Sequence, residues 1–379
     1  MLQPLSFAFT DPGTQTVTPS PVTCVRFDNE EELVWAGNAG GHLTSLCNTT
    51  AGELQKYTSV QIQRNRDLRT LLTGEFGVLS LSQDKLSLHH RRGARIFNYQ
   101  SQILRDMQCM EILPSGLVLL GGHHKDLMEF DLDRRRVIRT TELEEGCVII
   151  RNHQQFVCTG DLGGRISIRD PHTLKVQHRF STHTVTLSDF DVHCNYLITC
   201  GFSNRHSCAP DRFLMVYDLR MMQAVAPIPM AFAPYLLKFV PAFSSRFCVI
   251  SQTGKLQFFD VSSKLDTPLV DNLQLQPGNF VNSFDISSTC QAFAFGDSTG
   301  GVHLHGTNEE VLFNTYSRET ELVDAPLTPP PSIAFDDLLT PFTSIPLPDT
   351  PDISPLSSGD KLLSDWPEKL STIQYRYVK

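Results

Sequence analysis

Short apolar runs alternate with polar turns along most of this chain. Each unit contains a continuously apolar stretch, such as ELVWA from Glu32 or RFCVI from Arg246, then a polar turn that usually contains glycine. A run of period-2 alternation follows, as in residues 165–169. A continuous apolar run is typical of a strand packed on both faces, and period-2 alternation is typical of a half-exposed strand. The pattern therefore predicts sheets and no amphipathic helix.

The turn-and-strand units recur at a nearly constant interval. They begin at Gly37, Ser82, Gly122, Gly160, Gly201, Ser251 and Gly296. Successive starts are 45, 40, 38, 41, 50 and 45 residues apart, which brackets the period of roughly 40 to 45 residues of WD-repeat blades. Most units open with a further strand, such as VTCVRFD from Val22. Three or four strands per unit predict an all-β fold, a seven-bladed WD-repeat β-propeller over residues 21–316.

The Trp-Asp dipeptide that gives the repeat its name is absent. Its place is taken by Phe130-Asp131, Arg169-Asp170, Tyr217-Asp218 and Phe259-Asp260. We interpret these aspartates as structural, because a carboxylate at a strand end accepts hydrogen bonds from the adjacent turn. Residues 1–20 are predicted to form an N-terminal strand or arm. The sequence leaves open whether this strand or the segment VLFNTY from Val311 closes the ring.

Net charge, cysteine spacing and proline content limit the classes of function that this chain is expected to have. Apolar residues make up 40% of the chain and the net charge is −9, so a broad basic surface for nucleic acid is not expected. The ten cysteines include no CxxC pair, and they are interpreted as buried free thiols of a reducing compartment. Three prolines interrupt the most apolar stretch, from Met222 to Leu237, so no membrane association is predicted.

Three patterns could indicate chemistry, and each has a simpler interpretation. The segment GDSTGG superficially resembles a serine-protease nucleophile loop at Ser298, but it is the seventh copy of a blade turn. A cluster of soft ligands has irregular spacing for zinc and is predicted to bind no metal; it contains His193, Cys194, Cys200, His206 and Cys208. No glycine-rich phosphate loop is present. We predict no catalytic residue, metal or cofactor in this chain.

Two basic clusters are candidates for contact with RNA or a partner. By the strand register both should lie in exposed loops, and they consist of Arg91, Arg92, Arg95, Arg134, Arg135 and Arg136. Neither cluster has interleaved aromatic residues for base stacking. Solvated hairpins are therefore the simpler interpretation, and a contact with ribonucleoprotein is the alternative.

Residues 317–379 differ in character from the rest of the chain. Ten prolines lie between residues 324 and 379, a density that predicts a largely disordered linker. Large apolar residues are spaced through it, which favours docking on a partner over a purely flexible tether. The predicted partner-binding residues are Phe335, Leu338, Leu339, Phe342, Leu362, Leu363 and Trp366.

A propeller of degenerate blades followed by a proline-rich tether carrying LLSDWP, from Leu362 to Pro367, resembles the catalytic subunits of the Pan family of poly(A)-specific deadenylases. The resemblance implies that the tether binds a dimeric pseudokinase regulatory subunit. It also implies indirect association with poly(A)-binding protein and poly(A) RNA, and a place in the cytoplasm and P-bodies. The family's metal-dependent 3′-exoribonuclease domain does not follow here, so this chain is expected to act as a non-catalytic scaffold.

One alternative function comes from the generic class of WD-repeat adaptors. Such a protein would grip a peptide at the mouth of its channel, and phosphorylation at Ser/Thr-Pro steps would regulate its tail. These steps begin at Thr328, Thr340, Thr350 and Ser354.

Overall fold

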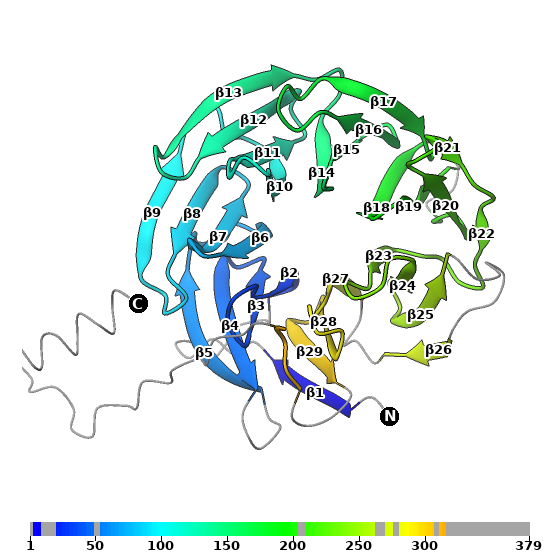
Figure 1. Cartoon of the computed structure of the whole chain (residues 1–379). Coiled ribbons are helices and arrows are strands. Elements are labelled where there is room, and N and C mark those ends of the chain that lie inside the picture. Colours follow the sequence, from blue (N-terminus) through cyan, green and yellow to red (C-terminus); the bar gives the residue numbers. More distant parts are fainter. Residues whose placement is uncertain are drawn as a thin grey trace, which may run out of the picture. The chain divides into compact units, whose positions relative to one another are not determined.

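Seven sheets surround a central axis in the computed structural model of the chain (Figure 1). The structure describes residues 3–8, 20–48, 54–203, 209–261, 270–275, 280–306 and 311–315. Every regular element in these ranges is a β-strand. The predicted seven-bladed, all-β propeller is confirmed. No described segment forms a helix of the length and apolarity that crossing a membrane requires.

The first four blades are four-stranded antiparallel meanders, with strands following one another from the axis outward. Blade 1 contains β2 (Val22–Phe27), β3 (Leu33–Asn38), β4 (His42–Asn48) and β5 (Leu54–Gln61). Blade 2 contains β6 (Leu68–Gly74), β7 (Gly77–Ser82), β8 (Lys85–His89) and β9 (Arg95–Gln100). Blade 3 contains β10 (Met107–Ile112), β11 (Val118–Gly122), β12 (Asp126–Asp131) and β13 (Arg136–Glu142). Blade 4 contains β14 (Cys147–Asn152), β15 (Val157–Asp161), β16 (Arg165–Arg169) and β17 (Val176–Ser181).

Blades 5 and 7 depart from this regularity, whereas blade 6 keeps it. In blade 5 two short strands share the outer edge, and the blade contains β18 (Thr186–His193), β19 (Tyr196–Phe202), β20 (Phe213–Asp218), β21 (Gln223–Ala224) and β22 (Ile228–Pro229). Blade 6 contains β23 (Leu236–Phe239), β24 (Arg246–Ile250), β25 (Lys255–Asp260) and β26 (Val270–Gln274). Blade 7 contains β27 (Val281–Ile286), β28 (Ala292–Asp297), β29 (Gly301–Gly306) and β1 (Gln3–Ala8).

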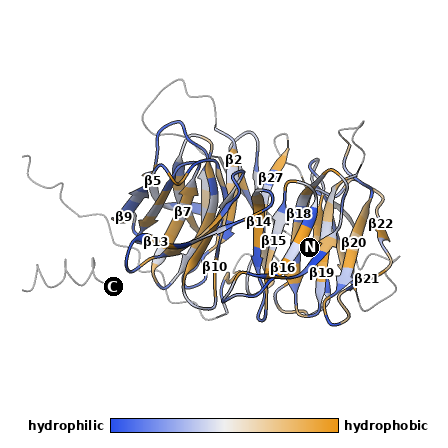
Figure 2. Ribbon diagram, turned by 90° about the horizontal axis from the view of Figure 1, so that it is seen from above, coloured by the Kyte–Doolittle hydropathy of each residue, from blue (hydrophilic) through white to orange (hydrophobic). Residues whose placement is uncertain are grey.

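The hydrophobic core is divided among the interfaces between blades. Seven clusters of buried residues are present, and each joins one blade to the next around the ring. The second strands supply much of this surface, since every residue of β3, β7 and β28 is buried. The outermost strand β13 instead alternates between exposed and half-buried positions. Figure 2, turned by 90° from Figure 1, shows hydrophobic residues along the strands of the blades. No blade buries its faces alone, so the repeats stabilise one another.

Glycines in the second strands allow the inner strand of the next blade to approach closely. A Cβ atom on Gly37 would lie 2.9 Å from Cβ of Leu68 in blade 2, and one on Gly296 would lie 2.2 Å from Cγ1 of Val22 in blade 1. A side chain at either position would therefore separate the blades. Gly296 is at the interface between the last blade and the first, where the ring closes.

Both segments that the sequence left as candidates contribute to ring closure. Strand β1 pairs antiparallel with β29 from Gln3↔Gly306 to Ala8↔Gly301, so the N-terminus supplies the outer strand of the last blade. Phe313 is fully buried and packs its ring against Phe27 of blade 1, with ring centroids 5.2 Å apart. The backbone amides of Phe313 and Asn314 donate to the Glu32 carboxylate. Closure through both ends removes an unpaired sheet edge.

Candidate functional site

The central channel of the propeller is a polar site to which every blade contributes. A cavity of about 360 Å³ is lined by residues of all seven inner strands. A second cavity of about 270 Å³ lies toward the ends of these strands. Three charged residues, Arg26, Glu111 and Lys238, line both cavities. We call the part of the channel that these three residues surround the channel waist.

Strand register places one residue of each blade at an equivalent level of the channel. A β-bulge interrupts the pairing of the first and second strands in six blades, and the equivalent residue lies two positions beyond it. In blade 6, whose pairing has no bulge, Lys238 takes this place, as the hydrogen bonds described below show. The seven residues, in ring order, are Arg26, Leu72, Glu111, Arg151, Asp191, Lys238 and Asp285.

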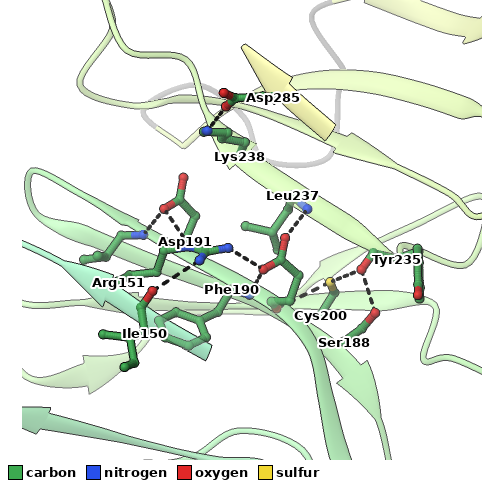
Figure 3. A network of polar contacts seen from close by, with 12 residues as sticks. Ile150, Arg151, Ser188, Phe190, Asp191, Cys200, Tyr235, Leu237, Lys238 and Asp285 are labelled. Atoms are coloured by element: carbon green, nitrogen blue, oxygen red, sulfur yellow. Dashed lines mark hydrogen bonds and ion pairs between the residues drawn. The ribbon is translucent and has the colours of Figure 1, made fainter. Parts of the chain in front are cut away.

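Charges alternate around these seven residues, which we call the charge ring. From blade 3 to blade 7 the order is acidic, basic, acidic, basic, acidic, and Arg26 of blade 1 is basic again. Two pairs of oppositely charged neighbours form ion pairs. Arg151 Nε lies 3.7 Å from Asp191, and Lys238 is in direct contact with Asp285 (Figure 3). Alternation lets Asp191 and Asp285 each face a cation of the preceding blade, which offsets part of the cost of burying both charges.

The carboxylates of the charge ring also join neighbouring blades through the backbone. Asp191 accepts a hydrogen bond from the amide of Phe239 at 2.8 Å, and Asp285 accepts one from Phe27, also at 2.8 Å. In each case the donor is the residue that follows the ring position in the next blade. The inner edge of a propeller blade has backbone N–H groups with no strand partner. These aspartates supply the missing acceptors.

A second acidic residue adds to the ring in blade 5. Asp189 accepts a hydrogen bond from Arg151 at 2.9 Å and another from the amide of Leu237 at 3.1 Å. Burial raises the pKa of Asp189 to about 6, although the positive charge of Arg151 opposes this shift. Burial, and after it the positive charge of Arg26, lowers the pKa of Lys238 to about 7, while Asp191 and Asp189 oppose this shift. The channel thus contains two titratable groups, Asp189 and Lys238, whose pKa values lie near neutral pH.

Arg26 and Glu111 differ from the other charged residues of the ring. Neither forms an ion pair with another described residue, and the Glu111 carboxylate accepts only the adjacent amide of Ile112, at 3.3 Å. Burial raises the pKa of Glu111, while Arg26 and Arg151 oppose the shift. Leu72, the neutral member of the ring, lies between them in ring order. No residue in the sequence analysis had been assigned to the channel, because period-2 patterns do not reveal which strands meet at the axis.

The basic cluster of residues 91–95 is not exposed throughout, and the prediction of exposure is wrong for Arg91. Its side chain is 12% exposed and pairs with the fully buried Asp28 of blade 1 at 2.8 Å. Asp28 also accepts a hydrogen bond from Trp35 Nε1 at 2.8 Å. The reason is the contact between blades: the turn after β8 packs over a buried carboxylate of the preceding blade. Arg91 is therefore a structural residue.

The remaining predicted basic residues lie at two neighbouring hairpins. Arg92 and Arg95 lie in blade 2, where Arg92 is half-buried and hydrogen-bonded to Tyr57, and Arg95 is exposed. Arg134 and Arg135 lie in the turn between β12 and β13 of blade 3, Arg136 is the first residue of β13, and all three are exposed. The Arg135 guanidinium lies 5.5 Å from the centre of the Phe97 ring of β9. This contact brings the two clusters together, which the sequence did not predict.

The prediction that the strand-end aspartates are structural is confirmed. Asp131 accepts hydrogen bonds from the amides of residues 133 and 134, Asp170 from those of residues 172 and 173, and Asp218 from that of residue 220. Asp260 accepts one from the Ser245 hydroxyl at 2.7 Å. Each carboxylate stabilises the turn that follows its strand or an adjacent hairpin.

Candidate chemistry receives no support from the geometry. The described residues contain no group of three or more His, Cys, Asp or Glu side chains that could hold a metal ion. Cys200 is buried, as expected, but the expectation that Cys194 faces the core is wrong, because it lies exposed in a turn at φ 49°. His206 and Cys208 lie outside the described residues. Ser298 hydrogen-bonds with the backbone of Phe280 at the foot of a blade turn.

Sequence reasoning missed a buried polar triad in blade 5. His183 Nδ1 lies 2.8 Å from Asp211, and its Nε2 lies 3.0 Å from the Thr199 hydroxyl. Burial lowers the pKa of His183 despite the Asp211 carboxylate. The triad ties the turn before β18 to the second strand and to the end of the long loop after it. A lone histidine just before an inner strand was the available signal.

The predicted partner-binding residues of the tail, from Phe335 to Trp366, lie outside the described residues. The structure therefore assigns the candidate sites to the channel and to the hairpins of blades 2 and 3. The seven-bladed ring of antiparallel sheets, with one repeat per blade, places this chain in the WD-repeat class of β-propellers.

Comparison with known proteins identifies the family. Residues 14–306 match the family described as PAN2 N-terminal, and the chain belongs to this family. It is 40% identical over 355 residues to a Homo sapiens protein named as the PAN2 catalytic subunit of the PAN2-PAN3 deadenylation complex. The Gallus gallus protein of the same name is 39% identical over 350 residues. These alignments cover 92% of this chain and 28% of each relative.

More distant relatives agree. A Caenorhabditis elegans protein named as a polyA-specific ribonuclease subunit is 30% identical over 385 residues, which cover 96% of this chain and 32% of that protein. The structure of the Neurospora crassa Pan2 WD40 domain superposes with a TM-score of 0.75 at 22% identity, covering 82% of this chain and 96% of that domain. This likeness shows the propeller fold. The chain spans about a third or less of its curated relatives.

Proposed function

We propose that this chain acts as a binding part of a deadenylation complex, with the tail contacting a pseudokinase regulatory subunit and the propeller helping to position poly(A) ribonucleoprotein. Family membership carries this proposal, because relatives are named as subunits of such a complex. The described propeller offers a channel and basic hairpins suited to binding. In this proposal the chain contributes no catalytic residue or cofactor and works in the cytoplasm, including P-bodies.

The proposed contact with the regulatory subunit rests on the apolar residues of the tail. Large apolar side chains in a proline-rich segment gain stability chiefly when a partner covers them. The test is co-purification of the regulatory subunit with the full chain, with a chain that ends at Thr315, and with a triple variant carrying Phe335→Ala, Phe342→Ala and Trp366→Ala. We expect most of the partner to be lost in both altered chains.

A propeller variant serves as the matched control for this experiment. Arg220→Gln changes an exposed charge on the hairpin after β20 of blade 5 and should leave recovery of the regulatory subunit unchanged. Undiminished recovery with both altered tails would contradict the proposed tail contact. Normal thermal unfolding of the truncated chain would show that any loss of binding does not come from unfolding of the propeller.

The poly(A) part of the proposal rests on the two neighbouring hairpins. Arg95 and residues 134–136 are exposed, and phosphate contacts by arginine provide sequence-independent affinity. With a net charge of −9, the chain would use this local patch and not its overall field. The generic adaptor remains the second candidate because four Ser/Thr-Pro steps lie in the tail. It predicts co-purified partners that include no deadenylase subunit.

A further inference from the structure

An odd number of blades prevents the charge ring from alternating completely. Seven positions cannot be filled so that every neighbour has the opposite sign, and at least one position must be neutral or repeat a sign. In this ring the break falls at Leu72 of blade 2, between Arg26 of blade 1 and Glu111 of blade 3. The two charged residues beside the break are the two ring charges without an ion pair to another described residue.

Unpaired charges at this depth are costly. Arg26 and Glu111 are half-buried and line both channel cavities. The other ring charges are already engaged, since Arg151 pairs with Asp189 and Asp191, and Lys238 pairs with Asp285. A cation and a carboxylate partly removed from water gain stability when complementary groups reach them. The channel waist therefore presents one anion-binding and one cation-binding group.

We propose that the channel waist binds a short peptide segment of a partner protein that carries one acidic and one basic side chain. The acidic side chain pairs with Arg26, and the basic side chain pairs with Glu111. The larger cavity, at about 360 Å³, falls within the size range of protein ligand sites, roughly 300 to 1,000 Å³. The aliphatic stem of the basic side chain would pass Leu72.

The separation of the two groups favours a peptide over smaller ligands. Arg26 and Glu111 belong to blades 1 and 3, so a whole ring position lies between them. A free amino acid carries its amine and carboxylate on one carbon, so it offers the two charges at a single short spacing. A nucleic acid would satisfy Arg26 through phosphate but would place negative charge against Glu111. Two side chains of a peptide supply both signs at a wider spacing.

Fluorescence anisotropy on the full chain tests this proposal. The probes are labelled peptides, capped at both ends, in which one aspartate and one lysine are adjacent or separated by one or two glycines, in both orders. At least one probe should bind saturably, and Arg26→Gln and Glu111→Gln should each weaken it by about tenfold or more. An Asn/Gln version of the same probe should not bind. Arg220→Gln, at an exposed position on the hairpin after β20 of blade 5, is the control and should leave affinity unchanged.

A change of preference distinguishes recognition from a structural role. Arg26→Glu makes both groups at the break acidic, so it should favour a probe with two lysines over the Asp/Lys probe. Glu111→Arg should favour a probe with two aspartates. If circular dichroism shows that Arg26→Glu or Glu111→Arg does not fold, the binding measured with Arg26→Gln and Glu111→Gln decides the outcome. The proposal is overturned if no probe binds, if the Gln variants bind normally, or if free aspartate and lysine bind as tightly as the peptide.

Discussion

The channel and the outer hairpins contain the same kinds of side chain in opposite environments. In the channel, Asp285 is 3% exposed, contacts a lysine and accepts an amide of the next blade. On the hairpin of blade 3, Asp131 accepts amides of its own turn, and its partner Arg134 has a side chain that is 65% exposed. The first arrangement joins blades, whereas the second finishes a turn.

Position in the ring, and not residue type, decides what a charge does. Arg91 and Arg134 both lie in hairpins between third and outer strands, yet Arg91 reaches a buried carboxylate of the preceding blade while Arg134 stays at the surface. Buried pairs are costly to break because the remaining partner stays desolvated. Exposed pairs exchange protein contacts for water at little cost.

Removing one carboxylate from the channel and one from an outer hairpin tests whether burial decides how much each contributes to stability. Asp285→Ala should lower the free energy of unfolding by about 3 to 5 kcal/mol, because Lys238 loses its buried partner and the Phe27 amide its acceptor. Asp131→Ala should cost about 1 kcal/mol or less. Urea unfolding followed by circular dichroism measures both. Equal losses would show that burial is not the deciding factor.

Acidification should act on the buried region through His89. Burial, followed by the charge of Arg95, lowers the pKa of His89 to about 4 from its ordinary value of 6.5. Between pH 4 and pH 6.5 His89 is protonated in the unfolded chain but neutral in the folded chain. The stability that depends on neutral His89 is therefore fully present above pH 6.5 and is lost as the pH falls toward 4. The loss should reach roughly 3 kcal/mol.

The pH experiment needs a comparison because other groups titrate in the same range. Asp189, whose pKa burial raises to about 6, works in the opposite sense, since its stabilisation is lost as the pH rises. The measurement is therefore the difference between the wild-type chain and His89→Gln in urea unfolding from pH 8 to pH 4. Parallel stability curves for the two chains would refute the assignment to His89.

Arg91 and Arg134 allow the same test with a smaller expected difference in stability. Arg91→Ala should lower stability by about 2 to 3 kcal/mol, because Asp28 loses a two-point partner and is fully buried. Arg134→Ala should change stability by less than about 0.5 kcal/mol. Thermal unfolding of both variants under the same conditions measures the difference. A loss for Arg134→Ala as large as that for Arg91→Ala would contradict the structural role given to Arg91.

The outer hairpins should affect binding without affecting the fold. Gln substitutions at Arg95 and at residues 134–136 together should leave the unfolding midpoint nearly unchanged. They should weaken ultraviolet crosslinking of oligo(A) and reduce its dependence on salt, because fewer counterions are released. Arg220→Gln, on the corresponding hairpin of blade 5, is the matched control. Unchanged crosslinking in the multiple variant would exclude this patch as an RNA contact.

Much of the fold could be predicted because a propeller repeats. A constant interval between turns and a continuously apolar second strand, as in β3 or β28, mark each blade without reference to its neighbours. The aspartates at strand ends were interpreted correctly for the same reason, since their hydrogen bonds lie within a few residues. The burial of Arg91 and the triad around His183 escaped prediction, because their partners Asp28 and Asp211 lie 63 and 28 residues away.

The sequence by itself determined the number of blades, the order of strands within them and the structural role of the turn aspartates, because all of these depend on local patterns. Only the tertiary structure decided how the ring closes and which residues meet at its axis. The charge ring takes one residue from each of seven blades, so its members are dozens of residues apart in the chain. Closing an odd-numbered ring brings Arg26 and Glu111 to either side of Leu72, and no local pattern contains that relation.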